Sequence, residues 1–287
     1  MTIDAVEAER VSDSVNELGE SPAWDAESAL VLWVDLVRGD VLEGELRDDR
    51  VRELSRFHAG DSVGAVMVGQ SGERIVAGPR HLIRISRDRT QLSASRVIAD
   101  QKPSRLNDAK VDPWGRVLVG TASFQPGVNN AEALLREEVD GSFTVIDDDL
   151  SLSNGICWSP DGQTLYYVDS LIGKVWARDY RVGKLGQRRA HLTIDSGIPD
   201  GMCMDDEGQL WIAVWGSGYV SRFRDDGQET ARVSIDSAHP TSVAFVGPQL
   251  DTLLITAAND RLFAAGVGVA GWPVAVAQPL DAMRPDL

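Results

Sequence analysis

One pattern recurs six times along the chain and limits the folds that it can adopt. Each copy has a polar residue, a short apolar stretch, a turn and a second apolar stretch, and the turn has the form D/S-x-x-G in the clearest copies. These are LNDAKVDPWGRVLVGT at 106–121, SNGICWSPDGQTLYYVDS at 153–170 and PDGMCMDDEGQLWIAVWG at 199–216. Weaker copies lie at 20–35, 61–78 and 241–256. Apolar stretches rich in β-branched and aromatic residues, separated by such turns, predict an all-β protein made of repeats.

The spacing of the repeats predicts a β-propeller. They start 41 to 47 residues apart, which suits four-stranded blades, and the residue four positions after each start is apolar, as packing between blades requires. The starts are Glu20, Asp61, Asn107, Asn154, Asp200 and Thr241. We predict a six-bladed β-propeller around a central channel, formed by a single domain over residues 1–287, in which about the first 12 residues could be disordered. A β-sandwich is the alternative that the pattern leaves open.

Composition excludes several classes of protein. A net charge of −16, from 28 basic and 44 acidic side chains, argues against a nucleic-acid partner, because phosphate binding needs clustered Lys and Arg. Cys157 and Cys203 are too few for a disulfide scaffold or a four-cysteine metal site, and we predict two buried free thiols. The sequence has no run of eighteen apolar residues and no signal-peptide pattern at its start, so we expect a cytoplasmic protein that binds no membrane. Few open sheet edges make a monomer the expectation.

Three of the repeat starts could form a metal site. The inner strands of a propeller surround one channel, so Glu20, Asn154 and Asp200 are expected to meet at one mouth. Two carboxylates and an amide oxygen suit Ca²⁺, Mg²⁺ or Mn²⁺, and Zn²⁺ is not excluded. Without a cation the two carboxylates would repel, and at least one should have a raised pKa. Asn and Asp before Gly also favour turns by themselves, but Glu20 is not a turn residue, and the three together favour a metal site.

Several joined motifs resemble one family. LGESPAW, RLNDAKVDPWGRVLVGT, SNGICWSPDGQTLYYVDS, PDGMCMDDEGQLWIAVWGSGYVSRF and PTSVAFVGPQLDTLLIT look like the successive signatures of the SMP-30/gluconolactonase/luciferin-regenerating enzyme (LRE) family, in order from about residue 17 to 275. The resemblance implies a six-bladed propeller with one divalent cation, and hydrolysis of sugar lactones as the usual activity. By motif, it implies that Glu20, Asn154 and Asp200 are metal ligands and that Arg105 and Asn107 bind the substrate.

The expected function is that of a divalent-metal-dependent lactone hydrolase. The cation would polarise the carbonyl of a sugar or related lactone for attack by water. Asp200 is the candidate catalytic base, and metal-bound hydroxide is the alternative way to activate the water. An organophosphate hydrolase using the same site, or a non-catalytic Ca²⁺-binding propeller, would fit the same ligands. The alternative role for Arg105 is an ion pair with Asp108 or another surface acid. A small-molecule lactone is the only partner expected.

Three departures from the family pattern concern the substrate. Leu106 stands where Pro or Phe is usual, and the segment 122–133 offers Gln125 but no carboxylate before Glu132. The segment 257–263 looks short, which suggests a more open mouth. A polyhydroxylated sugar acid would lose one strong acceptor, so a lactone less polar than D-glucono-1,5-lactone, or a related metal-assisted reaction, fits equally well.

Overall fold

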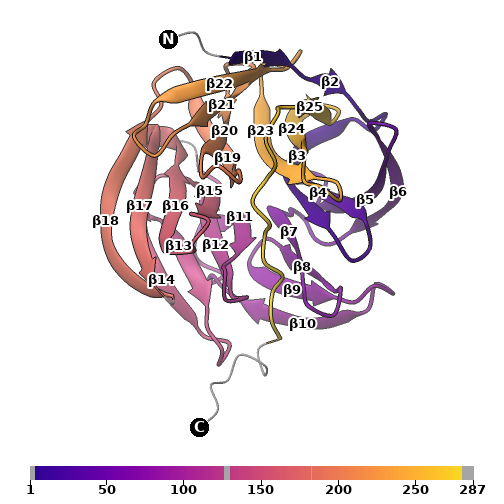
Figure 1. Ribbon diagram of the computed structural model, residues 1–287. Helices are drawn as coiled ribbons and strands as arrows, with labels where there is room; N and C mark the ends of the chain where they lie inside the picture. Colours follow the sequence, from indigo (N-terminus) through magenta and orange to yellow (C-terminus); the bar gives the residue numbers. More distant parts are fainter. Residues whose placement is uncertain (1–3, 126–129, 182, 280–287) are drawn as a thin grey trace.

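The computed structural model describes residues 4–125, 130–181 and 183–279, which form six blades in a ring around a central channel (Figure 1). The strands of blade one are β3 (Asn16–Asp25), β4 (Leu30–Asp35), β5 (Asp40–Arg47) and β6 (Arg50–His58). Those of blade two are β7 (Ala65–Val68), β8 (Arg74–Ala77), β9 (His81–Ile85) and β10 (Gln91–Arg96). Those of blade three are β11 (Ser104–Val111), β12 (Val117–Ser123), β13 (Glu132–Glu137) and β14 (Phe143–Leu150). In each blade the first strand lies innermost and its neighbours pair antiparallel in chain order.

Blades four and five follow the same plan. The elements of blade four are β15 (Ser153–Trp158), β16 (Thr164–Asp169), the short 3₁₀ helix η1 (Ser170–Ile172), β17 (Lys174–Arg181) and β18 (Lys184–Thr193). The strands of blade five are β19 (Ile198–Met204), β20 (Leu210–Trp215), β21 (Tyr219–Phe223) and β22 (Glu229–Ser234). The six-bladed, all-β architecture predicted from the repeats is confirmed.

The two ends of the chain meet in blade six. Its inner strands are β23 (Pro240–Val246), β24 (Thr252–Asp260) and β25 (Phe263–Gly266), and its outermost strand is the N-terminal β2 (Glu9–Arg10). The strand β1 (Asp4–Glu7) pairs in parallel with β22 at the outer edge of blade five. The Arg10 guanidinium donates to the Asp260 carboxylate at 3.1 Å, which fixes this closure. Part of the first 12 residues, for which disorder was considered, therefore lies in strands.

Apolar faces pack between the blades, and buried ion pairs cross some of the seams. Arg74 in blade two donates to Asp25 and to Glu43 in blade one, at 2.8 Å in each case, and all three side chains are buried. Between blades two and three, Arg84 donates to both carboxylate oxygens of Glu137. A buried ion is costly unless it is paired, so these contacts fix how neighbouring blades meet.

The second repeat starts at Val63, and its assignment to Asp61 is wrong by two residues. Asp61 is exposed and precedes β7 in a loop. A Cβ added to Gly64 would lie 2.1 Å from the backbone carbonyl oxygen of Asn107 in the next blade, and one added to Gly155 would lie 2.5 Å from the equivalent oxygen in blade five. The two glycines allow the same close approach between inner strands, so they correspond. The residue before Gly64 is the apolar Val63, so a pattern of polar repeat starts does not include it.

The C-terminal strap, residues 270–279, crosses one mouth of the channel. It is the yellow segment that runs over the middle of the ring in Figure 1. Trp272 donates its backbone N–H to the carbonyl of Met204 in blade five, and Ala277 donates to Val68 in blade two, both at 2.9 Å. The strap thus bridges opposite sides of the ring. Among residues 4–125, 130–181 and 183–279, no helix is long and apolar enough to span a membrane.

Candidate metal and substrate site

β-Bulges position the candidate site residues on the inner strands. The register between the first and second strands shifts at the repeat start in five blades, and a bulge of this kind redirects the side chains at which it occurs. The shifts lie between Glu20 and Ala23, Leu106 and Ala109, Asn154 and Ile156, Pro199 and Met202, and Pro240 and Ser242. Equivalent backbone irregularities therefore occur at the same end of the channel, away from the strap.

Two of the predicted ligands, Glu20 and Asp200, are buried acids whose negative charges repel each other. Glu20 and Asp200 are each only 8% exposed, although they lie 180 residues apart in the chain. Burial raises the pKa of Glu20 well above its usual value, and the charges of Asp200 and Asp108 raise it further. Burial and Asp108 likewise raise the pKa of Asp200, against the opposing effect of Arg105. The ring thus holds three carboxyl groups and one guanidinium in a buried cluster.

The oxygen atoms of this cluster fit a hard cation. Asp200 Oδ1 is buried and has no hydrogen-bond partner among the described residues, and an oxygen in that state is costly unless a ligand uses it. Glu20 Oε2 accepts a hydrogen bond from the backbone N–H of Ser21 at 3.1 Å. Within the described part of the chain no three His, Cys, Asp or Glu side chains form a metal-binding group. The amide oxygen of Asn154 is a candidate for a further ligand beside the two carboxylates. Carboxylate and amide oxygens are the donors that Ca²⁺ and Mg²⁺ prefer.

The amide of Asn154 is held in one orientation by its neighbours. Its Nδ2 donates to Ser170 Oγ at 3.0 Å, in η1 of the same blade. Its Oδ1 accepts from Asn107 Nδ2 at 2.7 Å, which leaves the second lone pair of that oxygen for another partner. Asn107 also donates to the backbone carbonyl of Ser153 at 2.9 Å. The hydrogen bonds explain why amides are used at the repeat starts on β11 and β15, where strand formation does not favour them.

Arg105 belongs to the same network. Its NH1 donates to Asn107 Oδ1 at 2.6 Å and to the backbone carbonyl of Leu106 at 3.0 Å. Burial lowers the pKa of Arg105, and the charges of Glu20 and Asp200 oppose that change. In the described part of the chain Arg105 and Asp108 form no ion pair within 4 Å, so the alternative role considered for Arg105 is not observed. The positive charge of its guanidinium interacts favourably with the negative charges of Glu20 and Asp200 instead.

Two further acids lie near the candidate site: the charge of Asp108 acts on Glu20 and Asp200, and that of Glu132 acts on Arg105. Asp108 follows Asn107 in the R-x-N-D motif, and the sequence interpretation gave it no part in the site beyond an ion pair with Arg105. Glu132, at the start of β13, accepts from Ser104 Oγ at 2.9 Å and from Thr121 Oγ1 at 2.6 Å, and its charge attracts Arg105. Both carboxylate oxygens of Glu132 are therefore engaged within blade three. No sequence pattern links Ser104, Thr121 and Glu132, because they lie on three separate strands.

The departures from the family pattern have different structural outcomes. Leu106 is fully buried in the apolar core between blades two and three, so its side chain fills the core. Gln125 is exposed, and the adjoining residues 126–129 lie outside the described part of the chain. Only Arg261 and Leu262 lie between β24 and β25, so this connection is tight.

The fold and this site together define a class of protein: a six-bladed β-propeller with buried carboxyl and amide groups and a guanidinium at one mouth of its channel. The chain belongs to the SMP-30/Gluconolactonase/LRE-like family, whose model matches residues 18–259. This confirms the resemblance seen in the sequence motifs.

The relatives cover nearly the whole chain. Regucalcin of Xenopus laevis is 34% identical over 270 residues, which are 91% of this chain and 89% of that protein. A regucalcin structure from Agrobacterium tumefaciens, described as a calcium-binding protein, has a TM-score of 0.88 at 24% identity and covers 96% of this chain and 99% of its own. A gluconolactonase structure from Xanthomonas campestris has a TM-score of 0.73 at 25% identity, covering 87% of this chain and 86% of its own.

Proposed function

We propose that the protein is a divalent-metal-dependent hydrolase that opens a sugar or related lactone. The observation that carries this proposal is the pair of buried acids, Glu20 and Asp200, one with an unpartnered oxygen, beside the hydrogen-bonded Arg105 and Asn107. Such a pair is unfavourable without a cation, whereas a site of this composition suits a cation and a polar substrate together. A similar structure from Xanthomonas campestris is a gluconolactonase, which supports the reaction class.

Each residue has a distinct role in this proposal. Glu20, Asn154 and Asp200 hold the cation, and three protein ligands leave positions for other molecules. When bound, the cation draws electron density from the lactone carbonyl and stabilises the negative charge that develops on its oxygen. Arg105 donates hydrogen bonds to substrate oxygens, and Asn107 orients Arg105 through its Oδ1.

The proposed reaction adds one molecule of water across the ring ester. Asp200 accepts a proton as the oxygen of water bonds to the carbonyl carbon. The bond between that carbon and the ring oxygen then breaks, and the proton passes to the departing oxygen. The product is the open-chain hydroxy acid. Arg105 carries no proton transfer, because its guanidinium stays charged and acts through hydrogen bonds.

The test is lactone hydrolysis measured by pH-stat on chelator-stripped protein, with Ca²⁺, Mg²⁺, Mn²⁺ and Zn²⁺ added separately. Sugar lactones and aliphatic lactones should be compared. We expect one or more ions to restore turnover and Asp200→Asn to abolish it. Asp226→Asn is the matched control, because Asp226 is an exposed turn residue of the same blade and the substitution changes the charge equally. It should retain activity.

Other outcomes separate the alternative functions. Ion binding by calorimetry, without turnover of any lactone or phosphotriester, would overturn the proposal and favour a non-catalytic calcium-binding propeller. Turnover of phosphotriesters alone would show an organophosphate hydrolase on the same site. Lactone hydrolysis that survives both chelation and Asp200→Asn would contradict the assigned ligands.

A further inference from the structure

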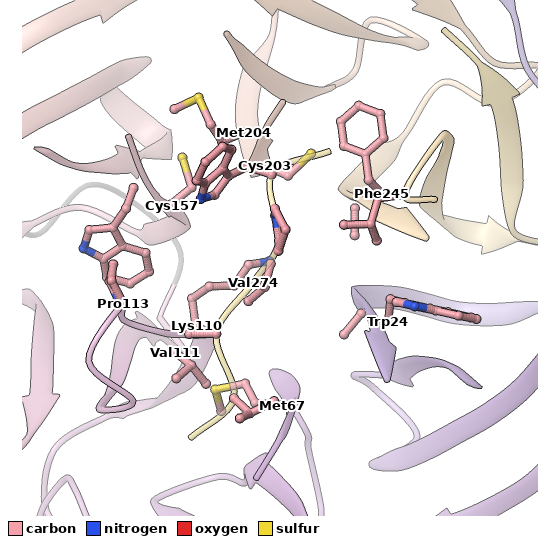
Figure 2. A pocket seen from close by; sticks show the side chains of 18 of the residues that line it. Trp24, Met67, Lys110, Val111, Pro113, Cys157, Cys203, Met204, Phe245 and Val274 are labelled. Carbon is pink, nitrogen blue, oxygen red and sulfur yellow. The ribbon is translucent and has the colours of Figure 1, made fainter. Parts of the chain in front are cut away.

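A cavity of about 460 Å³ occupies the other half of the channel, between the inner strands and the C-terminal strap (Figure 2). Its size lies within the range of small-molecule sites. Two rings of side chains, three and four positions after the repeat starts, form its walls. The residues three positions after the starts, called the upper ring, are Ala23, Val66, Lys110, Cys157, Cys203 and Ala244. The residues four positions after the starts, called the lower ring, are Trp24, Met67, Val111, Trp158, Met204 and Phe245. Every blade contributes to both rings.

Lys110 is the one charged residue in the two rings, and its side chain is half-buried. The other five residues of the upper ring are Ala, Val or Cys, and the free thiols of Cys157 and Cys203 are buried, as predicted. Burial raises the pKa of both thiols, so they remain uncharged at neutral pH. Figure 2 shows Lys110 in the midst of the apolar side chains that line the cavity. A half-buried ammonium among apolar side chains can therefore form a charge-assisted contact with an anionic ligand.

The described residues provide no close anionic partner for Lys110. No carboxylate lies within the 4 Å of an ion pair, although the charge of Asp108 on the same strand is near enough for Lys110 to lower its pKa against the effect of burial. Asp161 is the other charged residue that lines the cavity, and its Oδ1 accepts from Ser159 Oγ at 2.6 Å and from the backbone N–H of Gln163 at 3.0 Å. Its carboxylate is thus engaged in its own turn.

The strap presents apolar surface at the cavity. Trp272, Val274 and Val276 line the cavity and are 42%, 59% and 41% exposed, whereas Ala277 is fully buried. Three large apolar side chains exposed within five residues form a patch of the kind that marks ligand or partner sites. Because these residues line the cavity, the patch and Lys110 belong to one site.

We propose that this cavity binds a small apolar monocarboxylate. The carboxylate pairs with the Lys110 ammonium, and the hydrocarbon lies between the two rings and the strap. A neutral apolar molecule would fill the space but leave Lys110 without a partner, and an apolar cation would meet repulsion. The net charge of −16 disfavours anions in general, so the local cation has to provide the attraction. This proposal does not depend on the lactonase reaction.

The test compares octanoate, octan-1-ol and octylammonium by titration calorimetry at 0.15 M salt, below their aggregation limits. We expect octanoate to bind about tenfold more tightly than octan-1-ol, the effect of one charge-assisted contact, and octylammonium to bind more weakly than either. This comparison uses the unaltered protein and needs no variant to fold. Failure of octanoate to bind, or equal affinities for octanoate and octan-1-ol, would overturn the proposal.

Variants then locate the site. Lys110→Met should weaken octanoate binding about tenfold and leave octan-1-ol binding unchanged. Lys184→Met is the matched control, because Lys184 is exposed on β18 and its loss changes the net charge equally. Ala244→Leu should weaken both ligands by filling the upper ring. Octanoate binding that survives Lys110→Met but fails in Arg105→Lys would place the acid at the other mouth and contradict the proposal.

Discussion

The two halves of the channel share the same six inner strands and differ in chemistry. On β19, Asp200 lies at the candidate metal site and Met204 lines the apolar cavity, and on β15 the same is true of Asn154 and Trp158. Four residues of extended strand span only about 13 Å. Polar groups are held by bulges and hydrogen bonds at one end, and apolar groups pack in rings at the other. A repeat can therefore assign different roles to two ends of one strand, and each end should respond separately to substitution.

The strongest test of this separation uses two residues of β19. Asp200→Asn should lower metal-dependent lactone turnover at least about a thousandfold, because several kcal/mol of transition-state stabilisation depend on the cation. Cys203→Ala, three positions further along the strand, should leave turnover within about twofold. Steady-state kinetics on both variants decide the matter. A comparable loss in Cys203→Ala would show that the two ends are coupled.

The reverse contrast applies to stability on β15. Trp158 is buried and its ring lies 5.9 Å from that of Tyr180. Trp158→Ala should lower the free energy of unfolding by about 3 to 5 kcal/mol through loss of packing. Asn154→Ala should cost only about 1 to 2 kcal/mol for its hydrogen bonds. Urea unfolding of the metal-free protein measures the free energy of unfolding of both variants. A larger loss for Asn154→Ala than for Trp158→Ala would show that packing at the strap end is not the main source of stability on β15.

A seam between blades provides a change that should affect neither end. Burial alone would raise the pKa of Glu43, but hydrogen bonds from Arg89, Arg74 and Ser55 outweigh it and lower the pKa from 4.5 to about 2. The carboxylate therefore stabilises the fold above its unfolded pKa, and this contribution is lost as pH falls from about 4.5 towards 2. Glu43→Gln should remove up to about 3 kcal/mol at pH 7 and flatten this pH dependence.

Unfolding of the parent protein and Glu43→Gln at several pH values between 2 and 7 checks this expectation. The two curves should converge as the solution becomes more acidic. Metal binding at pH 7 should be the same in both proteins, since Glu43 lies on β5, away from the inner strands. A stability difference that stays constant with pH would refute the role of the ionised carboxylate.

The smallest effect is expected at Arg105. Lysine cannot reproduce the guanidinium contacts with Asn107 Oδ1 and the Leu106 carbonyl. Arg105→Lys should therefore lower kcat/KM for a lactone about tenfold, while the affinity for the metal alone stays within about twofold. Calorimetry and kinetics separate the two quantities. A parallel loss of metal affinity would show that Arg105 supports the cation site itself.

The fold could be predicted because its signal is local and repeated. Turns such as Ser159–Gly162 and the apolar stretches beside them recur at blade length, and they predict strands independently of distant contacts. The exception is instructive. The second repeat starts with Val63, whereas the pattern of polar starts predicts the exposed Asp61. The correct start is marked by the close approach of Gly64 to the neighbouring blade, and this contact cannot be seen in the sequence.

The surroundings of the site were less accessible to prediction. The contacts of Glu132 with Ser104 and Thr121 join three strands and follow no spacing rule. Lys110 was visible in the repeat alignment, since it occupies the position of Cys157 and Cys203, but an isolated lysine carries no signal until the cavity around it is known. The sequence thus predicts residues that occupy equivalent positions in the repeats, but it does not predict contacts between residues at different positions of the repeat.

The closure of the ring by β2 has a consequence for synthesis of the protein. Arg10 and Asp260 are 250 residues apart in sequence, yet they join in the finished blade six. Residues 4–10 are made before β22 and β25 and can find their places only after these two strands have been made. Blades one to four can form in order, but the barrier to the complete ring includes bringing the two ends of the chain together. A nascent chain halted before β22 would hold an open arc in which neither β1 nor β2 has its partner strand, the state in which we expect the protein to be most prone to aggregation.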